Sequence, residues 1–124
     1  MTGRLDGATV LIVEDEFLIM LDLEYILESE GARTVTASSL EEAIAAAERD
    51  YDAAVLDVRL PDGDVYPAAH KLLERDVPLV FHSGHAHNDN IEEDFPSAIA
   101  LEKPAREQAL VAALERQIAS TGLG

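Results

Sequence analysis

The sequence contains no cysteine and no tryptophan, and only 9 of its 124 residues are lysine or arginine. Without cysteine, neither a disulfide framework nor a thiolate metal site can form, so packing alone must hold the core together. The few basic residues stand against 25 aspartates and glutamates, which gives a formal net charge of -16 at pH 7. Such a charge repels nucleic acid phosphates and anionic membrane surfaces, so we expect direct contact with neither.

Long apolar runs are missing as well. No stretch approaches the ~20 apolar residues of a membrane-spanning helix, and the first residues lack the apolar segment and cleavage site of a signal peptide. We therefore expect a cytoplasmic protein. The length of 124 residues and the hydrophobic content of 48% fit one globular domain covering residues 1–124.

Short apolar segments recur along the chain and predict strands. Several are apolar almost throughout, which indicates burial on both faces, as in a parallel sheet. The predicted strands cover residues 8–13, 33–37, 53–56, 78–82 and 98–101.

Helical patterns lie between the predicted strands. Residues 16–30 have an apolar face and are followed by Gly31, a residue that commonly ends helices. Ser39 followed by Glu42 predicts a capping box at the start of the next helix.

The third and last helices also have start signals. Asp64 is expected to cap a helix with Pro67 in its first turn, and Pro104 is expected to open the last helix. The resulting alternation of five strands and five helices predicts an α/β fold, the flavodoxin-like (βα)5 doubly wound sandwich with a five-stranded parallel sheet. In such sheets, ligands bind beyond the carboxyl ends of the strands.

Polar residues follow four of the five predicted strands. Glu14 and Asp15 follow the first, Asp57 the third, Ser83 the fourth and Lys103 the fifth. We expect these side chains to gather at one edge of the sheet. Each alone has an ordinary structural explanation, but their joint occurrence in this order favours a functional site.

The three carboxylates would repel one another without a cation. At 4 Å, each pair of unit charges costs ~4 kcal/mol at an effective dielectric constant of 20. Mg²⁺ prefers oxygen ligands of this kind, whereas zinc fits less well because the chain has no cysteine. The sequence therefore predicts Mg²⁺ as the cofactor.

These residues and their surroundings resemble a known family. The segments "VLIVEDE" at 10–16 and "LDVRLPDGD" at 56–64, together with Ser83-Gly84 and Lys103-Pro104, look like the receiver domain of bacterial two-component response regulators. The resemblance spans nearly the whole chain. It implies a stand-alone receiver that is not an enzyme acting on outside substrates but catalyses only its own aspartyl phosphorylation and dephosphorylation.

The resemblance also implies individual roles and partners. Asp57 would accept a phosphoryl group from a sensor histidine kinase or a histidine phosphotransfer protein. Asp15 and Asp57 would bind Mg²⁺ directly, Glu14 through water, and Arg59 through its backbone carbonyl. The output would pass to a separate effector protein, or the chain would compete for phosphoryl groups as a sink. A homodimer is compatible with the sequence.

Contacts to the phosphoryl oxygens would come from Ser83 and Lys103, again by resemblance. In a phosphoryl transfer the equatorial oxygens carry the charge of the transition state, so a metal ion and a lysine lower the barrier electrostatically.

Finer features resemble the alphaproteobacterial receivers named FAT GUY. The segments concerned are "VPLVFHSGH" at 77–85, "DEFLIMLDLE" at 15–24 and "ALEKP" at 100–104. His82, Ser83 and His85 depart from the subgroup's motif. Many receivers carry an aromatic residue three positions before the lysine, where this chain has Ala100, so we expect the loop over 85–97 to respond to phosphorylation instead.

Other readings stay open at this stage. The chain could be a binding module that works without phosphorylation, or a Mg²⁺-dependent phosphohydrolase, although its length leaves no space for a substrate-enclosing cap. His82, His85 and His87 also form a pattern that could bind a transition metal.

Overall fold

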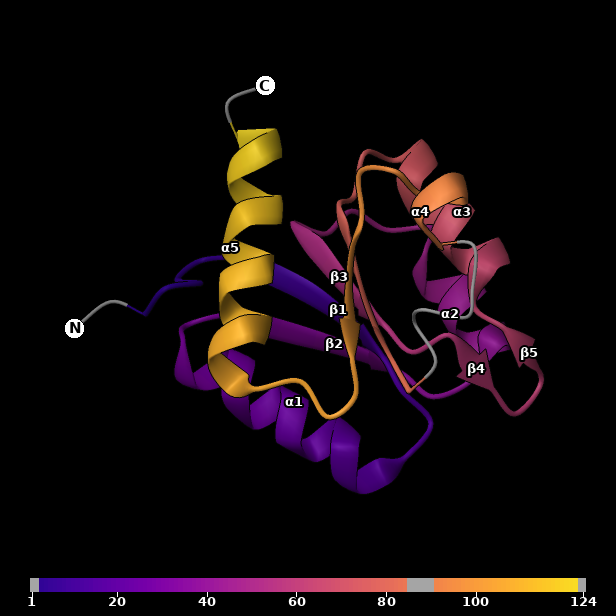
Figure 1. The fold of residues 1–124 in the computed structure, drawn as a ribbon, viewed down its shortest axis with the longest axis horizontal. Coiled ribbons are helices and arrows are strands. Elements are labelled where there is room, and N and C mark those ends of the chain that lie inside the picture. Colours follow the sequence, from indigo (N-terminus) through magenta and orange to yellow (C-terminus); the bar gives the residue numbers. More distant parts are fainter. Residues whose placement is uncertain (1–2, 85–90, 123–124) are drawn as a thin grey trace.

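The central element of the molecule is a five-stranded parallel sheet (Figure 1). The structure, a computed structural model, describes residues 3–84 and 91–122. The strand order is β2-β1-β3-β6-β7, with β1 at Thr9–Val13, β2 at Arg33–Ala37, β3 at Ala53–Leu56, β6 at Leu79–Ser83 and β7 at Ile99–Glu102. This is the flavodoxin-like order, so the predicted fold class is confirmed.

Helices cover both faces of the sheet (Figure 1). One layer holds α1 (Phe17–Ser29) and α5 (Glu107–Gly122), and the other holds α2 (Leu40–Ala46), α3 (Tyr66–Glu74) and α4 (Ile91–Asp94). Alternate residues of the central strands face opposite layers. Val10, Ile12, Val55 and Val80 belong to the core under α1 and α5, whereas Leu11, Val13, Leu56 and Phe81 belong to the core on the other face.

The sheet has a switch point between β1 and β3. The chain leaves β1 toward β2 on one side and returns to β3 on the other, as the pairings of β1 with both strands show. The loops that follow β1 and β3 therefore diverge and leave room for polar groups at the carboxyl edge. Glu14, Asp15 and Asp57 lie in these loops.

A short hairpin follows β3 and was not predicted. It consists of β4 (Arg59–Leu60) and β5 (Gly63–Asp64), which pair antiparallel around Pro61 and Asp62. The sequence contains the turn signal, because proline at the second and glycine at the fourth position are typical of a type I turn.

The helix starts differ from the prediction at two places. Asp64 does not cap α3, because it pairs in β5 and the N-cap is Val65, which makes no side-chain capping bond. Pro104 does not open α5, which begins at Glu107. The segment between Pro104 and Glu107 contacts β6, because the Ala105 N–H donates to His82 Nε2 at 3.4 Å.

Other predicted helix ends are confirmed. The N–H of Gly31 donates to the carbonyl of Glu28, and that of Ala32 to the carbonyl of Leu27, which is the Schellman arrangement at the end of α1. Ser39 Oγ accepts a hydrogen bond from the Glu42 N–H at the start of α2. The Glu42 carboxylate reaches the N–H of Ser38 rather than that of Ser39, so the capping box is displaced by one residue.

Within residues 3–84 and 91–122, no helix combines the length and the apolar character that crossing a membrane would require.

Gly31 gives the first testable prediction. Its φ is +93°, and a Cβ there would lie 2.7 Å from Asp6 Oδ1 and 2.8 Å from Asp6 Cα. Gly7 has a similar φ of +82°, but nothing lies within 4 Å of an added Cβ. We expect Gly7→Ala to lower the free energy of unfolding by ~1 kcal/mol through backbone strain alone, and Gly31→Ala to lower it by ~2 kcal/mol or more. Urea denaturation measures both, and equal losses would contradict the packing seen at Gly31.

Candidate phosphoryl-accepting site

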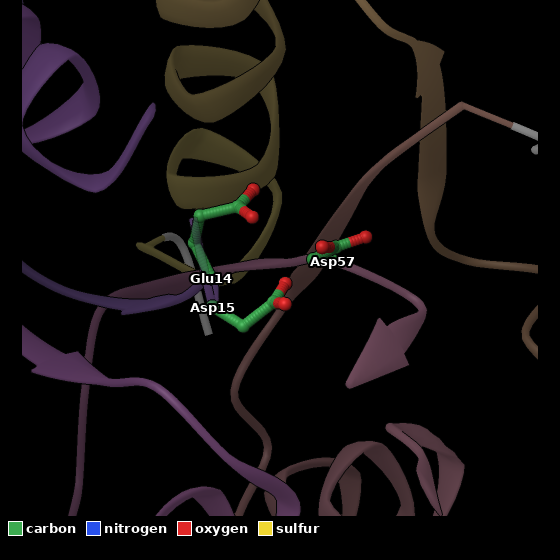
Figure 2. A group of neighbouring side chains, drawn as sticks. All are labelled: Glu14, Asp15 and Asp57. Carbon is green, nitrogen blue, oxygen red and sulfur yellow. The ribbon is translucent and has the colours of Figure 1, made fainter. Parts of the chain in front are cut away.

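Three carboxylates meet at the carboxyl edge of the sheet. Glu14 and Asp15 follow the end of β1, and Asp57 follows the end of β3. One carboxylate oxygen of each residue lies within 4.8 Å of one oxygen of each of the others (Figure 2). The backbone fixes this meeting, because the Asp57 N–H donates to the carbonyl of Val13 at 2.9 Å.

Lys103 brings the positive charge of the site. Its Nζ lies 2.8 Å from Glu14 Oε2 and 3.3 Å from Asp57 Oδ2. Glu14 is 1% exposed and Asp57 is 7% exposed, so the lysine pairs with two carboxylates that water hardly reaches. Asp15 is exposed and completes the cluster on its solvent side.

One ammonium does not neutralise this cluster, and the pKa values show it. Burial and the charge of Glu14 raise the pKa of Asp57 to about 7, although Lys103 acts in the opposite direction. Burial acts to lower the pKa of Lys103, but its hydrogen bond to Glu14 and the charges of Asp57 and Glu14 outweigh this, so the pKa is raised. The lysine therefore stays charged while Asp57 is held close to protonation.

The donor set fits a hard divalent cation. The cluster presents carboxylate oxygens alone, and three carboxylates against one ammonium leave an excess of negative charge when all are ionised. Mg²⁺ binds through one or two carboxylates and keeps several waters, which the exposed Asp15 allows. The raised pKa of Asp57 is itself a sign that a further positive charge would be stabilising at this place.

The remaining predicted residues surround the carboxylates. Ser83 is the last residue of β6 and is buried, and its carbonyl accepts a hydrogen bond from the Lys103 N–H at 2.9 Å. Arg59 is the first residue of β4, two positions beyond Asp57. The polar residues predicted at four strand ends thus lie at one edge of the sheet.

The histidine pattern has a different outcome. His82 is 6% exposed, lies in β6 and accepts the N–H of Ala105 through Nε2. Burial and the charge of Lys103 lower the pKa of His82, which favours its neutral form. His85 and His87 lie outside the described residues. His82 is therefore a buried residue of the sheet rather than part of an exposed loop.

An aromatic cluster was missed by the sequence reading. The rings of Tyr66 and Phe95 stack at 5.8 Å between centroids, and Phe81 lies 5.2 Å from Phe95. Ala100 lies on the edge strand β7 and pairs in register with Phe81 on β6. These aromatic residues are separated along the chain and follow no single period, so only the assembled fold brings them together.

An open parallel sheet of this strand order, with carboxylates and a lysine at its switch point, is typical of flavodoxin-like domains that bind ligands there. The family model described as the response regulator receiver domain matches residues 10–115. The chain belongs to this family, whose members are generally signalling modules of two-component systems rather than enzymes.

Two curated relatives come from Mycobacterium tuberculosis. The transcriptional regulatory protein TcrA is 38% identical over 76 residues, which is 60% of this chain and 30% of the relative. The probable transcriptional regulatory protein TcrX is 43% identical over 72 residues, which is 56% of this chain and 31% of the relative. The match spans about a third of the length of these relatives.

Solved structures agree with the fold. A response regulator receiver protein from Sinorhizobium medicae has a TM-score of 0.85 and 29% identity, with 94% of this chain and 98% of that chain covered. The receiver domain of the sensor histidine kinase PA1611 from Pseudomonas aeruginosa has a TM-score of 0.79 and 30% identity, with 91% and 98% covered. That second structure holds a magnesium ion coordinated in its active site cleft.

The pKa of Asp57 predicts how stability depends on pH. The pKa of Asp57 is about 7 in the folded chain, and its ordinary value is 3.8. Between pH 3.8 and pH 7 the folded state therefore binds more protons than the unfolded state. Without divalent cations, stability should therefore fall as the pH rises from 4 to 7 and then level off. Asp57→Asn removes the cost of ionising a buried carboxyl group. At pH 8 we therefore expect its free energy of unfolding to exceed that of the parent chain by ~2 kcal/mol.

Urea denaturation at pH 5 and pH 8 in the presence of a chelator measures this effect. The control is Asp94→Asn, which removes a charge from an exposed position on α4 and should not change the pH dependence. If Asp57→Asn were no more stable than the parent chain at pH 8, the raised pKa would be wrong.

Proposed function

We propose that this chain is a receiver domain that accepts a phosphoryl group on Asp57. The donor would be a phosphohistidine of a sensor kinase or phosphotransfer protein, and the signal would pass on by association with another protein. The observation that carries the proposal is the place of Asp57 at the sheet edge, with Glu14 and Asp15 on one side and Lys103 Nζ at 3.3 Å. Receiver membership and the magnesium ion in the Pseudomonas aeruginosa relative support it.

Three carboxylates and one backbone carbonyl would form the Mg²⁺ site. Asp15 and Asp57 would bind Mg²⁺ directly, the carbonyl of Arg59 would join them, and Glu14 would act through water. A bound Mg²⁺ would supply positive charge to phosphoryl oxygens. Glu14 has a second task that this structure supports, because its Oε2 accepts the hydrogen bond that holds Lys103 beside Asp57.

The chain's own residues would carry out the transfer. A carboxylate oxygen of Asp57 forms the new bond to phosphorus while the bond from phosphorus to the donor imidazole nitrogen breaks, and the nitrogen keeps the electron pair. Lys103 then exchanges its contact with the Asp57 carboxylate for one with a phosphoryl oxygen. The Ser83 hydroxyl, at the neighbouring strand end, would donate to another phosphoryl oxygen. The acyl phosphate would be lost by attack of water, which is the only hydrolysis we propose.

The exposed face of α1 supports docking of a protein donor. Phe17 is 72% exposed, Leu18 is 78% and Tyr25 is 73%, although large apolar side chains are usually covered. The face begins two residues after Asp15, so a partner that covers it reaches the acidic cluster. Acidic residues flank it, including Glu16 and Asp22, so it fits an apolar partner surface with a basic rim.

Other parts of the proposal rest on the sequence. The segments at 77–85 and 100–104 support the FAT GUY subgroup, and the family match over 10–115 supports one receiver domain across residues 1–124. The cytoplasmic location and the homodimer stay predictions.

Phosphorylation by a small donor tests the function directly. With acetyl phosphate and Mg²⁺, we expect intact-protein mass spectrometry to show one added phosphoryl group. Chelation of Mg²⁺ or the substitution Asp57→Asn should abolish it, whereas Asp94→Asn should not. The absence of labelling in the parent chain would contradict the proposal and favour a binding module, and turnover of outside phosphoesters would favour a phosphohydrolase.

Substitutions on α1 test the protein donor. Because Leu18 lies in the first turn of α1, three residues after Asp15, and Tyr25 lies two turns further along the helix, we expect Leu18→Ala to slow phosphotransfer from a sensor kinase by ~10-fold or more and Tyr25→Ala to slow it less. Phosphorylation by acetyl phosphate should be unchanged in both, since the small donor needs no docking surface. A profile against purified sensor kinases identifies the donor, and equal rates for Leu18→Ala and the parent chain would remove α1 from the interface.

A further inference from the structure

The β4–β5 hairpin carries a carboxylate that the phosphoryl site does not use. Asp62 lies at the tip of the hairpin, and its two oxygens accept hydrogen bonds from the N–H groups of Leu40 at 2.7 Å and Glu41 at 3.0 Å. These are the first two residues of α2, and 22 and 21 positions along the chain separate them from Asp62. The hairpin that follows the proposed phosphoacceptor is therefore attached to a different element.

The contact completes the start of α2. The first N–H groups of a helix have no partner inside it. At α2, Ser39 Oγ accepts from the Glu42 N–H, and Asp62 accepts from the two N–H groups before it. These hydrogen bonds lower the pKa of Asp62, so it is ionised where the positive end of the helix dipole favours a negative charge.

Packing adds a second tie at the same place. Gly63 has a φ of +142°, and a Cβ there would lie 3.1 Å from Leu40 Cδ2. The tip of the hairpin thus lies close against the side chain of the first residue of α2, which would have to shift to admit a Cβ. Its base is fixed as well, because the Val65 N–H donates to the Val58 carbonyl at 2.8 Å.

Arg59 lies between these two fixed ends. It pairs with Asp64 across the hairpin and follows Asp57 by two residues. Movement of the tip would therefore shift the peptide group that carries the Arg59 carbonyl. β4 and β5 form a separate two-stranded sheet that does not join the central one, and Leu60 anchors β4 in the core, so Asp62 and Gly63 hold the tip while Leu60 holds the strand.

We propose that Asp62 is a positioning residue of the phosphoryl site, acting through the hairpin on the Arg59 carbonyl. This inference rests on the proposed function. By the same connection, binding of a cation at the Arg59 carbonyl stabilises the first turn of α2, since coupling between two sites is reciprocal. Asp62 touches neither the metal nor the phosphoryl group, so its effect passes entirely through the backbone.

Two alanine substitutions at the same helix end separate positioning from stability. Asp62→Ala and Ser39→Ala each remove part of the cap of α2, but only Asp62 belongs to the hairpin. We expect both to lower the thermal stability, and only Asp62→Ala to weaken Mg²⁺ binding, by about fivefold in isothermal titration calorimetry. In the parent chain, Mg²⁺ should slow hydrogen exchange at the Leu40 and Glu41 amides, and Asp62→Ala should remove this protection.

Asp62→Asn keeps one acceptor oxygen, so its Mg²⁺ affinity should lie between those of the parent chain and Asp62→Ala. It replaces the alanine variant in the test if that variant does not fold. Equal Mg²⁺ affinities in the Asp62 and Ser39 variants would overturn the positioning role while leaving the proposed function intact. Failure of the parent chain to bind Mg²⁺ would instead overturn the proposed function, and the positioning role with it.

Discussion

The ammonium group of Lys103 lies between the buried carboxylates of Glu14 and Asp57, and the rest of the site depends on this contact. Without a cation between them, two carboxylates at this depth could not both be ionised. One lysine is not enough, because the pKa of Asp57 is still raised to about 7. A further positive charge would therefore stabilise the ionised carboxylates of the site. A divalent cation would supply this charge and keep Asp57 ionised, ready to accept a phosphoryl group.

This contact joins parts of the chain that are 89 residues apart, and the fold brings them together by strand order alone. Parallel strands deliver their carboxyl ends to the same edge, so the residues after β1, β3 and β7 meet without any loop having to reach across the molecule. The apolar layers under both faces fix the strands and hence the site. The hairpin after β3 forms a separate two-stranded sheet, which is why we propose that its attachment to α2 through Asp62 positions the Arg59 carbonyl.

Sequence reasoning predicted what local chemistry determines. Apolar runs predicted the five central strands, and the polar residues that end them, such as Asp57 and Lys103, predicted the position of the site. It did not predict what depends on distant partners: the hydrogen bonds of Asp62 to Leu40 and Glu41, the hydrogen bond of His82 with Ala105, and the ring contacts of Phe95. The residues around Asp64 predicted that it caps the next helix, but in the structure it pairs with Arg59 in the β4–β5 hairpin instead.

The central claim is that the carboxylates of Glu14, Asp15 and Asp57 converge to hold a divalent cation beside a modifiable aspartate. A crystal structure grown with Mg²⁺ and beryllium fluoride, a mimic of the phosphoryl group, tests it most directly. The account predicts a beryllium fluoride group bonded to Asp57 and contacted by Lys103, with Mg²⁺ on the oxygens of Asp15 and Asp57. Density for either group at another place, with the carboxylate of Asp57 left unmodified, would contradict it.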